Sequence, residues 1–393
     1  MNAWFPHEHR TASGEVVFDG QARGEGGPSR PLPAYVGVGQ SNPGGAAVSR
    51  VGTDLATFDP VVSLLDGAAL TGPFALARDG DTLIACCTWG TDGSPFIGHD
   101  MKIIYRSTDK GATWEGATTP FDAGIGSDFT VAANSPIPLG GGEWYCLATH
   151  GSTGFGSDLH VLHSTDDGLT WTAVGTSPGT SFGTIAYDGT YFFVTCANGS
   201  DGANTDAASV FRSTDLSTWE PVTTGFTMGA ALGLYATPSV VLVTANQAQG
   251  DTSLGLARST DHGASWTLLD AGPYAGAVYP YALATDGAGD WIAWMVDQSS
   301  NFGFSWIQSL DDGATWSTDD PVAAPWAISF SPMAFRTADG WFSVWGPTVA
   351  GVGSGNKLGY IAYTAPVENP LVWTPTGYAA PNMQAPLALV PVA

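Results

Sequence analysis

The chain has 393 residues, and 36 acidic against 12 basic residues give it a formal net charge of −24. This charge excludes nucleic acid and an anionic membrane surface as partners, because both attract clustered lysine and arginine. Hydrophobic residues make up 44% of the chain and charged residues 12%, while 52 glycines and 26 prolines favour turns and strands over helices.

The first predicted region is a short N-terminal arm, residues 1–33, which is rich in glycine, proline and charge. This composition is typical of a flexible leader. The alternative is a docking arm anchored by Trp4, Phe5 and the apolar run 15–18. We expect no secretory signal, because the first ten residues contain no apolar core. The uncharged stretch 221–250 is broken by proline and glycine, so we expect separate strands there and no membrane insertion.

From residue 34 onwards one motif, called the box below, recurs along the chain. It reads STDKGATW at 107–114, STDDGLTW at 164–171, STDHGASW at 259–266 and SLDDGATW at 309–316, with a shortened copy at 213–219 and a weaker one at 52–58. A degenerate turn at 363–373 completes a series with a period of about fifty residues, which predicts seven units of a repeat architecture.

The chemistry of the box predicts a structural turn. Its aspartate can accept hydrogen bonds from the backbone N–H groups that follow, its glycine supplies a positive φ, and its tryptophan packs between units. The residues to which we assign this structural role are Asp54, Asp109, Trp114, Asp166, Trp171, Asp215, Trp219, Asp261, Trp266, Asp311 and Trp316.

Three runs rich in β-branched and aromatic residues precede the box in most units, and the box turns the chain into a fourth. The first unit lacks its inner strand, which the run 386–392 is expected to supply. The predicted fold is all-β: a seven-bladed β-propeller of four-stranded antiparallel blades over 34–393, closed by a C-terminal strand that completes the first blade, with a short extended N-terminal arm. The four cysteines fall in strand-like runs and are expected to be buried thiols.

The box at this period resembles the Asp-box (BNR, sialidase-like) β-propeller family over about residues 34–393. The resemblance implies the fold but not one activity, because the family spans sialidases, other glycoside hydrolases, sorting receptors and non-catalytic binding modules. A sialidase would need three arginines that clamp a carboxylate, an acidic acid/base and a tyrosine nucleophile with a glutamate partner. We expect no sialidase chemistry, because the arginines beyond the arm are all predicted towards the box end, namely Arg50, Arg78, Arg106, Arg212, Arg258 and Arg336.

Long connections are expected at the end of the propeller opposite the boxes, and long loops on a rigid scaffold usually carry function. Seven aspartates fall there and are the candidate catalytic residues: Asp92, Asp100, Asp158, Asp201, Asp206, Asp251 and Asp297. A pair of carboxyls at glycosidase spacing acts as acid and base. Loop aspartates also solvate turns or hold a calcium ion, and the sequence singles out no pair.

No metal site is predicted, since His99, His150, His160 and His163 match no zinc motif. No cofactor is expected apart from the calcium ion that the loop carboxylates leave open.

Aromatic residues in the connections that enter each unit converge on the mouth of the central channel. The candidate ligand-binding residues among them are Phe129, Phe182, Tyr274, Tyr279 and Trp326. Aromatic faces beside polar side chains suit sugar rings, and packing between blades is the alternative role.

We therefore expect a non-catalytic recognition or structural module. The preferred setting is a bacteriophage virion, as a tail, fibre or capsid appendage made in the host cytoplasm. There the loops would contact a cell-surface glycan or receptor, and residues 1–33 would bind other virion proteins. The alternative is a glycoside hydrolase that uses an aspartate pair on the long-loop face.

Overall fold

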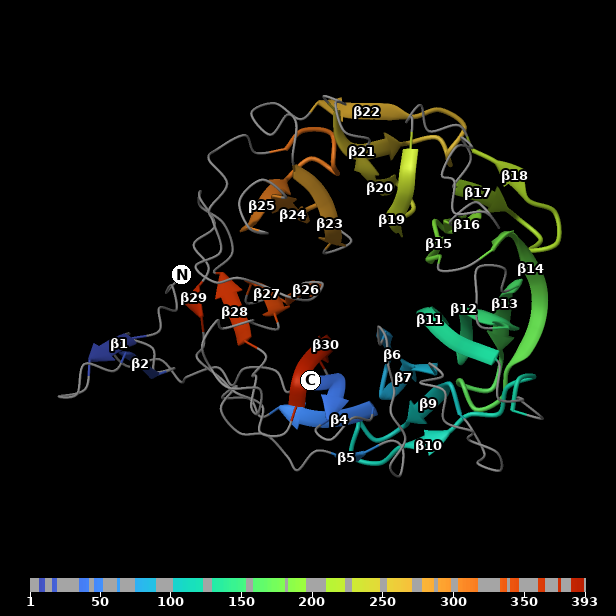
Figure 1. Cartoon of the computed structure of the whole chain (residues 1–393), viewed down its shortest axis with the longest axis horizontal. Coiled ribbons are helices and arrows are strands. Elements are labelled where there is room, and N and C mark those ends of the chain that lie inside the picture. Colours follow the sequence, from blue (N-terminus) through green and yellow to red (C-terminus); the bar gives the residue numbers. More distant parts are fainter. Residues whose placement is uncertain are drawn as a thin grey trace.

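The computed structural model describes part of the chain, and every element within that part is a β-strand. The described residues are 7–10, 16–19, 35–41, 46–51, 62–63, 75–89, 102–122, 129–152, 158–180, 183–195, 210–222, 228–247, 253–270, 278–285, 289–297, 303–316, 333–337, 340–345, 360–364, 374–375 and 383–391. Within these ranges no helix has the length and apolar character needed to cross a membrane. The sheets surround a central axis, so the predicted all-β propeller fold is confirmed (Figure 1).

Five sheets around this axis have four strands each, and each sheet is named after its second strand. The β7 sheet contains β6 (Ala75–Asp79), β7 (Thr82–Cys86), β9 (Ile104–Ser107) and β10 (Glu115–Gly116). The β16 sheet contains β15 (Ile185–Tyr187), β16 (Phe192–Thr195), β17 (Val210–Ser213) and β18 (Glu220–Pro221). The β20 sheet contains β19 (Met228–Ala236), β20 (Val241–Gln247), β21 (Ser253–Ser259) and β22 (Thr267–Asp270). The β27 sheet contains β26 (Met333–Thr337), β27 (Gly340–Trp345), β28 (Tyr360–Thr364) and β29 (Thr374–Pro375). The β3 sheet contains β30 (Met383–Pro391), β3 (Tyr35–Ser41), β4 (Ala46–Val51) and β5 (Val62–Ser63).

Two further sheets differ in strand number. The β12 sheet has five strands: β8 (Thr88–Trp89), β11 (Phe129–Gly140), β12 (Glu143–Ser152), β13 (Asp158–Ser164) and β14 (Thr172–Thr180). The β24 sheet has three: β23 (Val278–Thr285), β24 (Trp291–Asp297) and β25 (Gly303–Ser309).

The prediction of seven four-stranded blades is therefore wrong: within the described residues only five blades have that form. One cause is the chain after β7, which continues into β8 and pairs with β11 of the next sheet. The other is that the chain after residue 316, where a fourth strand of the β24 sheet was expected, lies outside the described residues.

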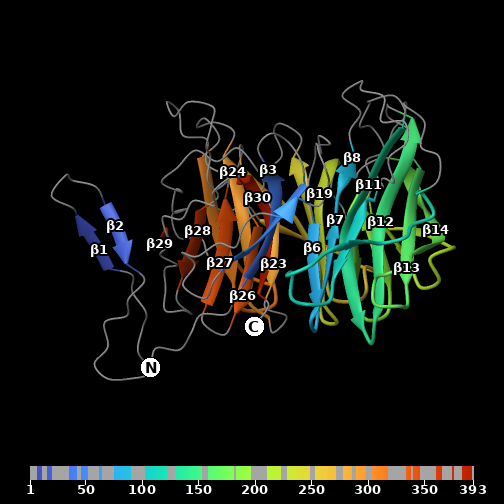
Figure 2. The same ribbon diagram turned by 90° about the horizontal axis from the view of Figure 1, so that it is seen from below.

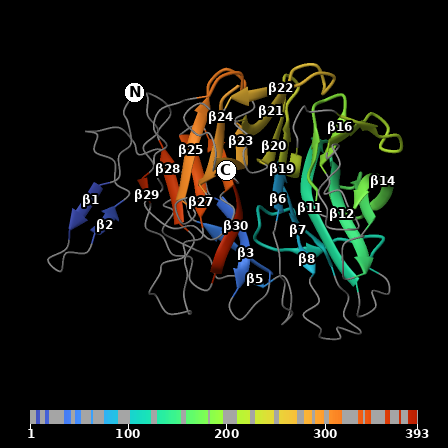
Figure 3. The ribbon, with the colours of Figure 1, turned by 45° about the horizontal axis from the view of Figure 1, so that its top comes forward.

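The chain closes on itself through its last strand. β30 pairs with β3 in antiparallel register, with Val38 opposite Ala388, and lies beside it in Figure 3. This is the pairing that the sequence predicts for the run 386–392. Closure removes an exposed sheet edge from the ring.

The N-terminal arm contains a hairpin, whereas an extended segment was predicted. β1 (His7–Arg10) pairs with β2 (Val16–Asp19), and neither pairs with another described strand. Figure 2 shows this hairpin set apart from the ring. The run of valines and phenylalanine in β2 has high strand propensity, which accounts for pairing in a segment too rich in glycine for a helix.

The core lies between neighbouring sheets. One buried cluster joins the β7 and β12 sheets, and others join β12 to β16, β16 to β20 and β20 to β24. Trp144, Phe193 and Trp291 are fully buried in these layers. Cys86, Cys87 and Cys146 are buried free thiols, and burial raises the pKa of Cys86 and Cys87 well above its usual value.

Candidate functional site

The boxes form one end of the propeller, and their hydrogen bonds are local. In the box at 164–171, Ser164 Oγ accepts from the Gly168 N–H at 3.0 Å and donates to Asp166 Oδ1 at 2.9 Å. Asp166 Oδ1 also accepts from the Thr170 N–H at 2.8 Å, and Trp171 Nε1 donates to the Gly168 carbonyl at 2.9 Å. The same four contacts recur in the boxes at 107–114, 259–266 and 309–316. These aspartates are therefore engaged in holding turns. Asp54 lies outside the described residues.

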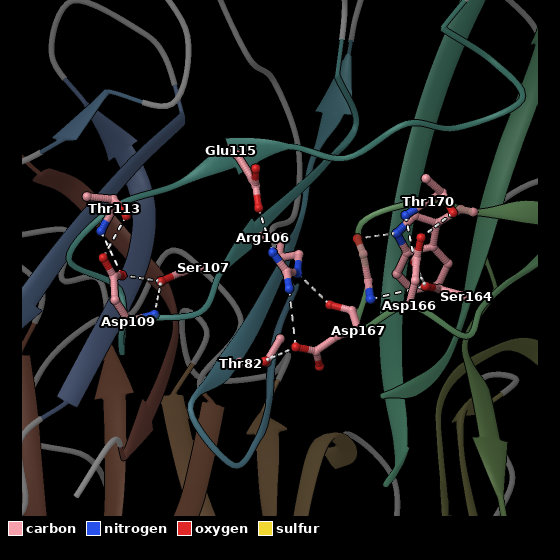
Figure 4. A network of polar contacts seen from close by, with 12 residues as sticks. Thr82, Arg106, Ser107, Asp109, Thr113, Glu115, Ser164, Asp166, Asp167 and Thr170 are labelled. Carbon is pink, nitrogen blue, oxygen red and sulfur yellow. Dashed lines mark hydrogen bonds and ion pairs between the residues drawn. The ribbon is translucent and has the colours of Figure 1, made fainter. Parts of the chain in front are cut away.

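An arginine before the box ties each of three sheets to the next. Arg106 Nε donates to the backbone carbonyl of Asp167 at 2.7 Å, and its other nitrogens pair with Asp167 and Glu115 (Figure 4). Thr82 Oγ1 donates to the same Asp167 carboxylate at 2.7 Å. Arg212 and Arg258 reach the carbonyls of the corresponding box residues in the same way. The three guanidinium groups are thus held at the box end.

A buried carboxylate lies at this end between the β16 sheet and the next box. The Asp188 side chain is 1% exposed, and its Oδ1 accepts from the N–H groups of Thr190 and Tyr191 at 2.8 Å. Its Oδ2 lies 2.8 Å from His262 Nδ1, a residue of the box in the β20 sheet. Asp188 is therefore fully engaged in joining two sheets.

A tyrosine–glutamate pair also lies near the box end, and it is unsuited to nucleophilic catalysis. Tyr145 donates to Glu143 Oε1 at 3.0 Å, and His163 stacks on the Tyr145 ring with centroids 4.3 Å apart. Burial, together with the Glu143 carboxylate, raises the pKa of Tyr145 to about 12. A nucleophilic phenol would need the opposite shift. Sequence reasoning missed this pair, although the alternating positions of EWY in a predicted strand place both residues on one face.

The opposite end of the sheets holds four of the predicted site residues. β13 runs from Asp158 to Ser164, where a box begins, so Asp158 lies at the end away from the boxes. Phe129 pairs with Ser152 at that same end of the β12 sheet. In the β24 sheet, Tyr279 and Asp297 occupy adjacent register positions at the corresponding end. The structure thus places one aromatic and one acidic position at this end of each of two sheets. The two positions share a face in the β12 sheet, whereas adjacent register positions lie on opposite faces in the β24 sheet.

The other predicted site residues lie outside the described residues. They are Asp92, Asp100, Asp201, Asp206, Asp251, Phe182, Tyr274 and Trp326.

Three strands, β12, β20 and β24, carry a polar residue at equivalent positions. In each of these strands one residue pairs with the first serine of a box. The polar residue lies the same number of positions after that paired residue in all three strands, as His150, Gln247 and Asp297. Each also lies opposite a residue near the start of the inner strand of its sheet. Sequence reasoning did not select Gln247, which counting along the strand from the box would have found. Within the described residues, no group of three or more His, Cys, Asp or Glu is arranged to hold a metal ion.

No protein-family model matches the chain, and no curated protein matches it. Among solved structures, a peptidase from Mycobacterium tuberculosis that hydrolyses puromycin is 11% identical, with 84% of this chain and 48% of that one covered at a TM-score of 0.50. A GH74 xyloglucanase from Xanthomonas campestris is 15% identical, with 88% of this chain and 56% of that one covered at a TM-score of 0.44. A PL25 ulvan lyase is 12% identical, with 86% of this chain and 96% of that one covered at a TM-score of 0.47. The chain spans about half the length of the first two proteins. At such identities the similarity is one of fold alone.

Proposed function

We propose that the chain is a non-catalytic recognition module that binds a glycan at the end opposite the boxes. The observation that carries this proposal is the presence of an aromatic and an acidic position at that end of each of two sheets. Phe129 and Asp158 share the end of the β12 sheet, and Tyr279 and Asp297 share the end of the β24 sheet. Aromatic rings suit the C–H faces of a sugar, and carboxylates accept hydrogen bonds from its hydroxyl groups.

The state of the box end supports the same assignment. Arg106, Arg212 and Arg258 there bind backbone carbonyls of the neighbouring sheet, and Asp188 is buried. Polar groups engaged in this way stabilise contacts between sheets and are not free to bind a ligand. Recognition is therefore assigned to the opposite end.

We also propose that the ring belongs to the Asp-box propeller family. The hydrogen bonds shared by the four boxes described above support this assignment.

The proposed setting is a bacteriophage virion, in which the ring contacts a host glycan or receptor and residues 1–33 bind other virion proteins. The β1–β2 hairpin, which pairs with no other described strand, supports a separate docking role for the arm. The net charge of −24 favours a partner other than nucleic acid.

A glycan array run beside a hydrolysis assay on the same glycans tests the proposal. We expect retention of at least one cell-surface glycan and no turnover. Turnover that one substitution abolishes, Asp158→Asn or Asp297→Asn, would instead establish the alternative, a glycoside hydrolase. The absence of both retention and turnover would overturn glycan recognition altogether.

A further inference from the structure

We infer that the end of the β12 sheet opposite the boxes, where this sheet faces the β7 sheet, forms a subsite for one neutral sugar residue. The subsite is built from the positions of Trp89, His150 and Asp158. This inference rests on the proposed glycan recognition and specifies where one sugar ring binds and which chemical class is accepted.

The first observation is the extra strand β8. The chain leaves the β7 sheet at Cys87, whose carbonyl accepts from the Ala133 N–H of β11 at 3.0 Å. The next two residues pair with β11, with Thr88 opposite Ala132 and Trp89 opposite Val131. Backbone pairing therefore places Trp89 in the edge strand of the β12 sheet, next to the inner strand β11.

The second observation is the register across this sheet. Trp89 is opposite Val131, Val131 is opposite His150, and His150 is opposite Asp158. Directly opposite residues in antiparallel strands are neighbours on the same face. An indole, an imidazole and a carboxylate position thus share one row, which spans roughly 14 Å, or three strand spacings.

The third observation identifies the face. Cys146 and Ala148 of β12 are buried in the cluster that includes Leu76 and Ile84 of the β7 sheet. Alternate residues of a strand share a face, so the His150 position continues this face towards the loops. The row therefore lies where the β12 sheet faces the β7 sheet.

Described side chains line the level directly below this row. His160, which pairs with Ala148, lies with its ring centroid 5.2 Å from that of Phe121. Beside Phe121, Asp122 forms an ion pair with Lys102, which precedes β9 of the β7 sheet, and both side chains are partly exposed.

The chemistry of the row favours a neutral sugar. An indole stacks on the C–H face of a pyranose, while imidazole and carboxylate groups bind its hydroxyls. A carboxylate at Asp158, in a chain with net charge −24, repels sialic and uronic acids. We therefore expect a neutral hexose or deoxyhexose residue in this subsite.

The test measures binding of the full chain to an array of glucose, galactose, mannose and rhamnose oligosaccharides, beside glycans ending in glucuronic or sialic acid. We expect a neutral glycan to bind, Trp89→Ala and Asp158→Asn to weaken it at least tenfold, and Trp89→Tyr to retain most of the affinity. The control is Leu310→Ala, which removes an exposed side chain at the box end and should change nothing. Thermal unfolding of each variant checks that the fold is kept.

The outcomes separate the subsite from the proposed function. Neutral glycan binding that survives Trp89→Ala in the folded protein, or binding restricted to acidic glycans, would overturn the subsite and leave glycan recognition standing. If Trp89→Ala does not fold, a tenfold loss in Asp158→Asn with affinity retained in Trp89→Tyr supports the subsite, and unchanged binding in Asp158→Asn overturns it. A parent chain that binds no glycan on the array would overturn both.

Discussion

The complete box at 164–171 and the shortened copy at 213–219 close equivalent turns in two sheets, but they do not form all the same hydrogen bonds. In both, a serine hydroxyl bonds to the aspartate and accepts a backbone N–H, and the aspartate accepts further N–H groups. In the short copy, Asp215 Oδ1 accepts from Ser217 at 2.9 Å and from Thr218 at 2.7 Å. Ser213 Oγ accepts from the Leu216 N–H at 2.8 Å. The part of the box centred on aspartate therefore survives the loss of a residue.

The parts that depend on glycine do not survive. Trp171 Nε1 donates to the carbonyl of Gly168, whereas the short copy has no glycine and Trp219 Nε1 is buried without a hydrogen-bond partner. Leu216, at φ +61°, takes the left-handed position that Asp167 occupies at φ +63° in the complete box. The box therefore has two functions. The aspartate closes the turn, while the glycine accepts the hydrogen bond of the tryptophan and packs against the neighbouring sheet.

The largest expected effect comes from Gly168→Ala. Gly168 has φ +83°, and a Cβ there would lie 2.2 Å from Ile84 Cδ1 of the β7 sheet. We expect a loss of about 3 kcal/mol in the free energy of unfolding, from a left-handed alanine at about 1–2 kcal/mol and overpacking at about 1–3 kcal/mol. Urea unfolding followed by tryptophan fluorescence measures it.

The matched control is Gly140→Ala, since Gly140 has φ +85° with no atom within 4 Å of the added Cβ. It should lose only the backbone contribution, about 1–2 kcal/mol. Equal losses in the two variants would mean that the box glycine serves the turn alone and does not join the sheets.

A smaller difference is expected between Trp171→Phe and Trp219→Phe. Both remove part of a large ring, which is buried in Trp171 and partly buried in Trp219. Only the first also leaves a glycine carbonyl without its indole donor. The second removes an N–H that is already buried and unpaired. We expect Trp171→Phe to cost about 1 kcal/mol more than Trp219→Phe, the usual net value of one hydrogen bond. The same urea experiment compares them, and a larger loss for Trp219→Phe would contradict the comparison.

The sequence predicted what depends on local bonds. The turns at Asp109 and Asp166 follow from residue types within eight positions, and the alternation of apolar runs with boxes predicted a closed ring with a last strand at 386–392. It could not predict β8, because Thr88 and Trp89 pair with a strand some forty residues later and no local turn signal marks them. It also missed the left-handed residue before each box glycine in the described part of the chain.

The candidate site divides in the same way. Counting residues from a box places Asp158 and Asp297 at the far ends of their sheets, and the structure agrees. Which positions meet across strands depends on register and bulges, such as the shift in β11 between Asn134 and Ile137. The row that contains Trp89 and His150 therefore could not be derived from spacing.

The smallest expected effect is a change in stability at acid pH. It tests the hydrogen bonds to the aspartate, which the complete boxes and the shortened copy share. The Ser265 hydroxyl and backbone N–H lower the pKa of Asp261 to about 2, from an ordinary value of 3.8. A carboxyl whose pKa is depressed on folding contributes stability that is complete above its unfolded pKa and is lost as the pH falls through its folded pKa. Asp261→Asn should therefore be less stable than the parent at neutral pH, and the two should converge between about pH 4 and pH 2.

Hydrogen bonds from Thr218 and Ser217 likewise hold the pKa of Asp215 well below its usual range. Asp215→Asn should consequently show a deficit of the same sign in urea titrations at successive pH values. Two results would contradict this comparison. One is a stability deficit at neutral pH for Asp261→Asn but not for Asp215→Asn, and the other is convergence of variant and parent that is already complete at pH 6. Either would mean that the shortened copy does not keep the aspartate contacts that the geometry indicates.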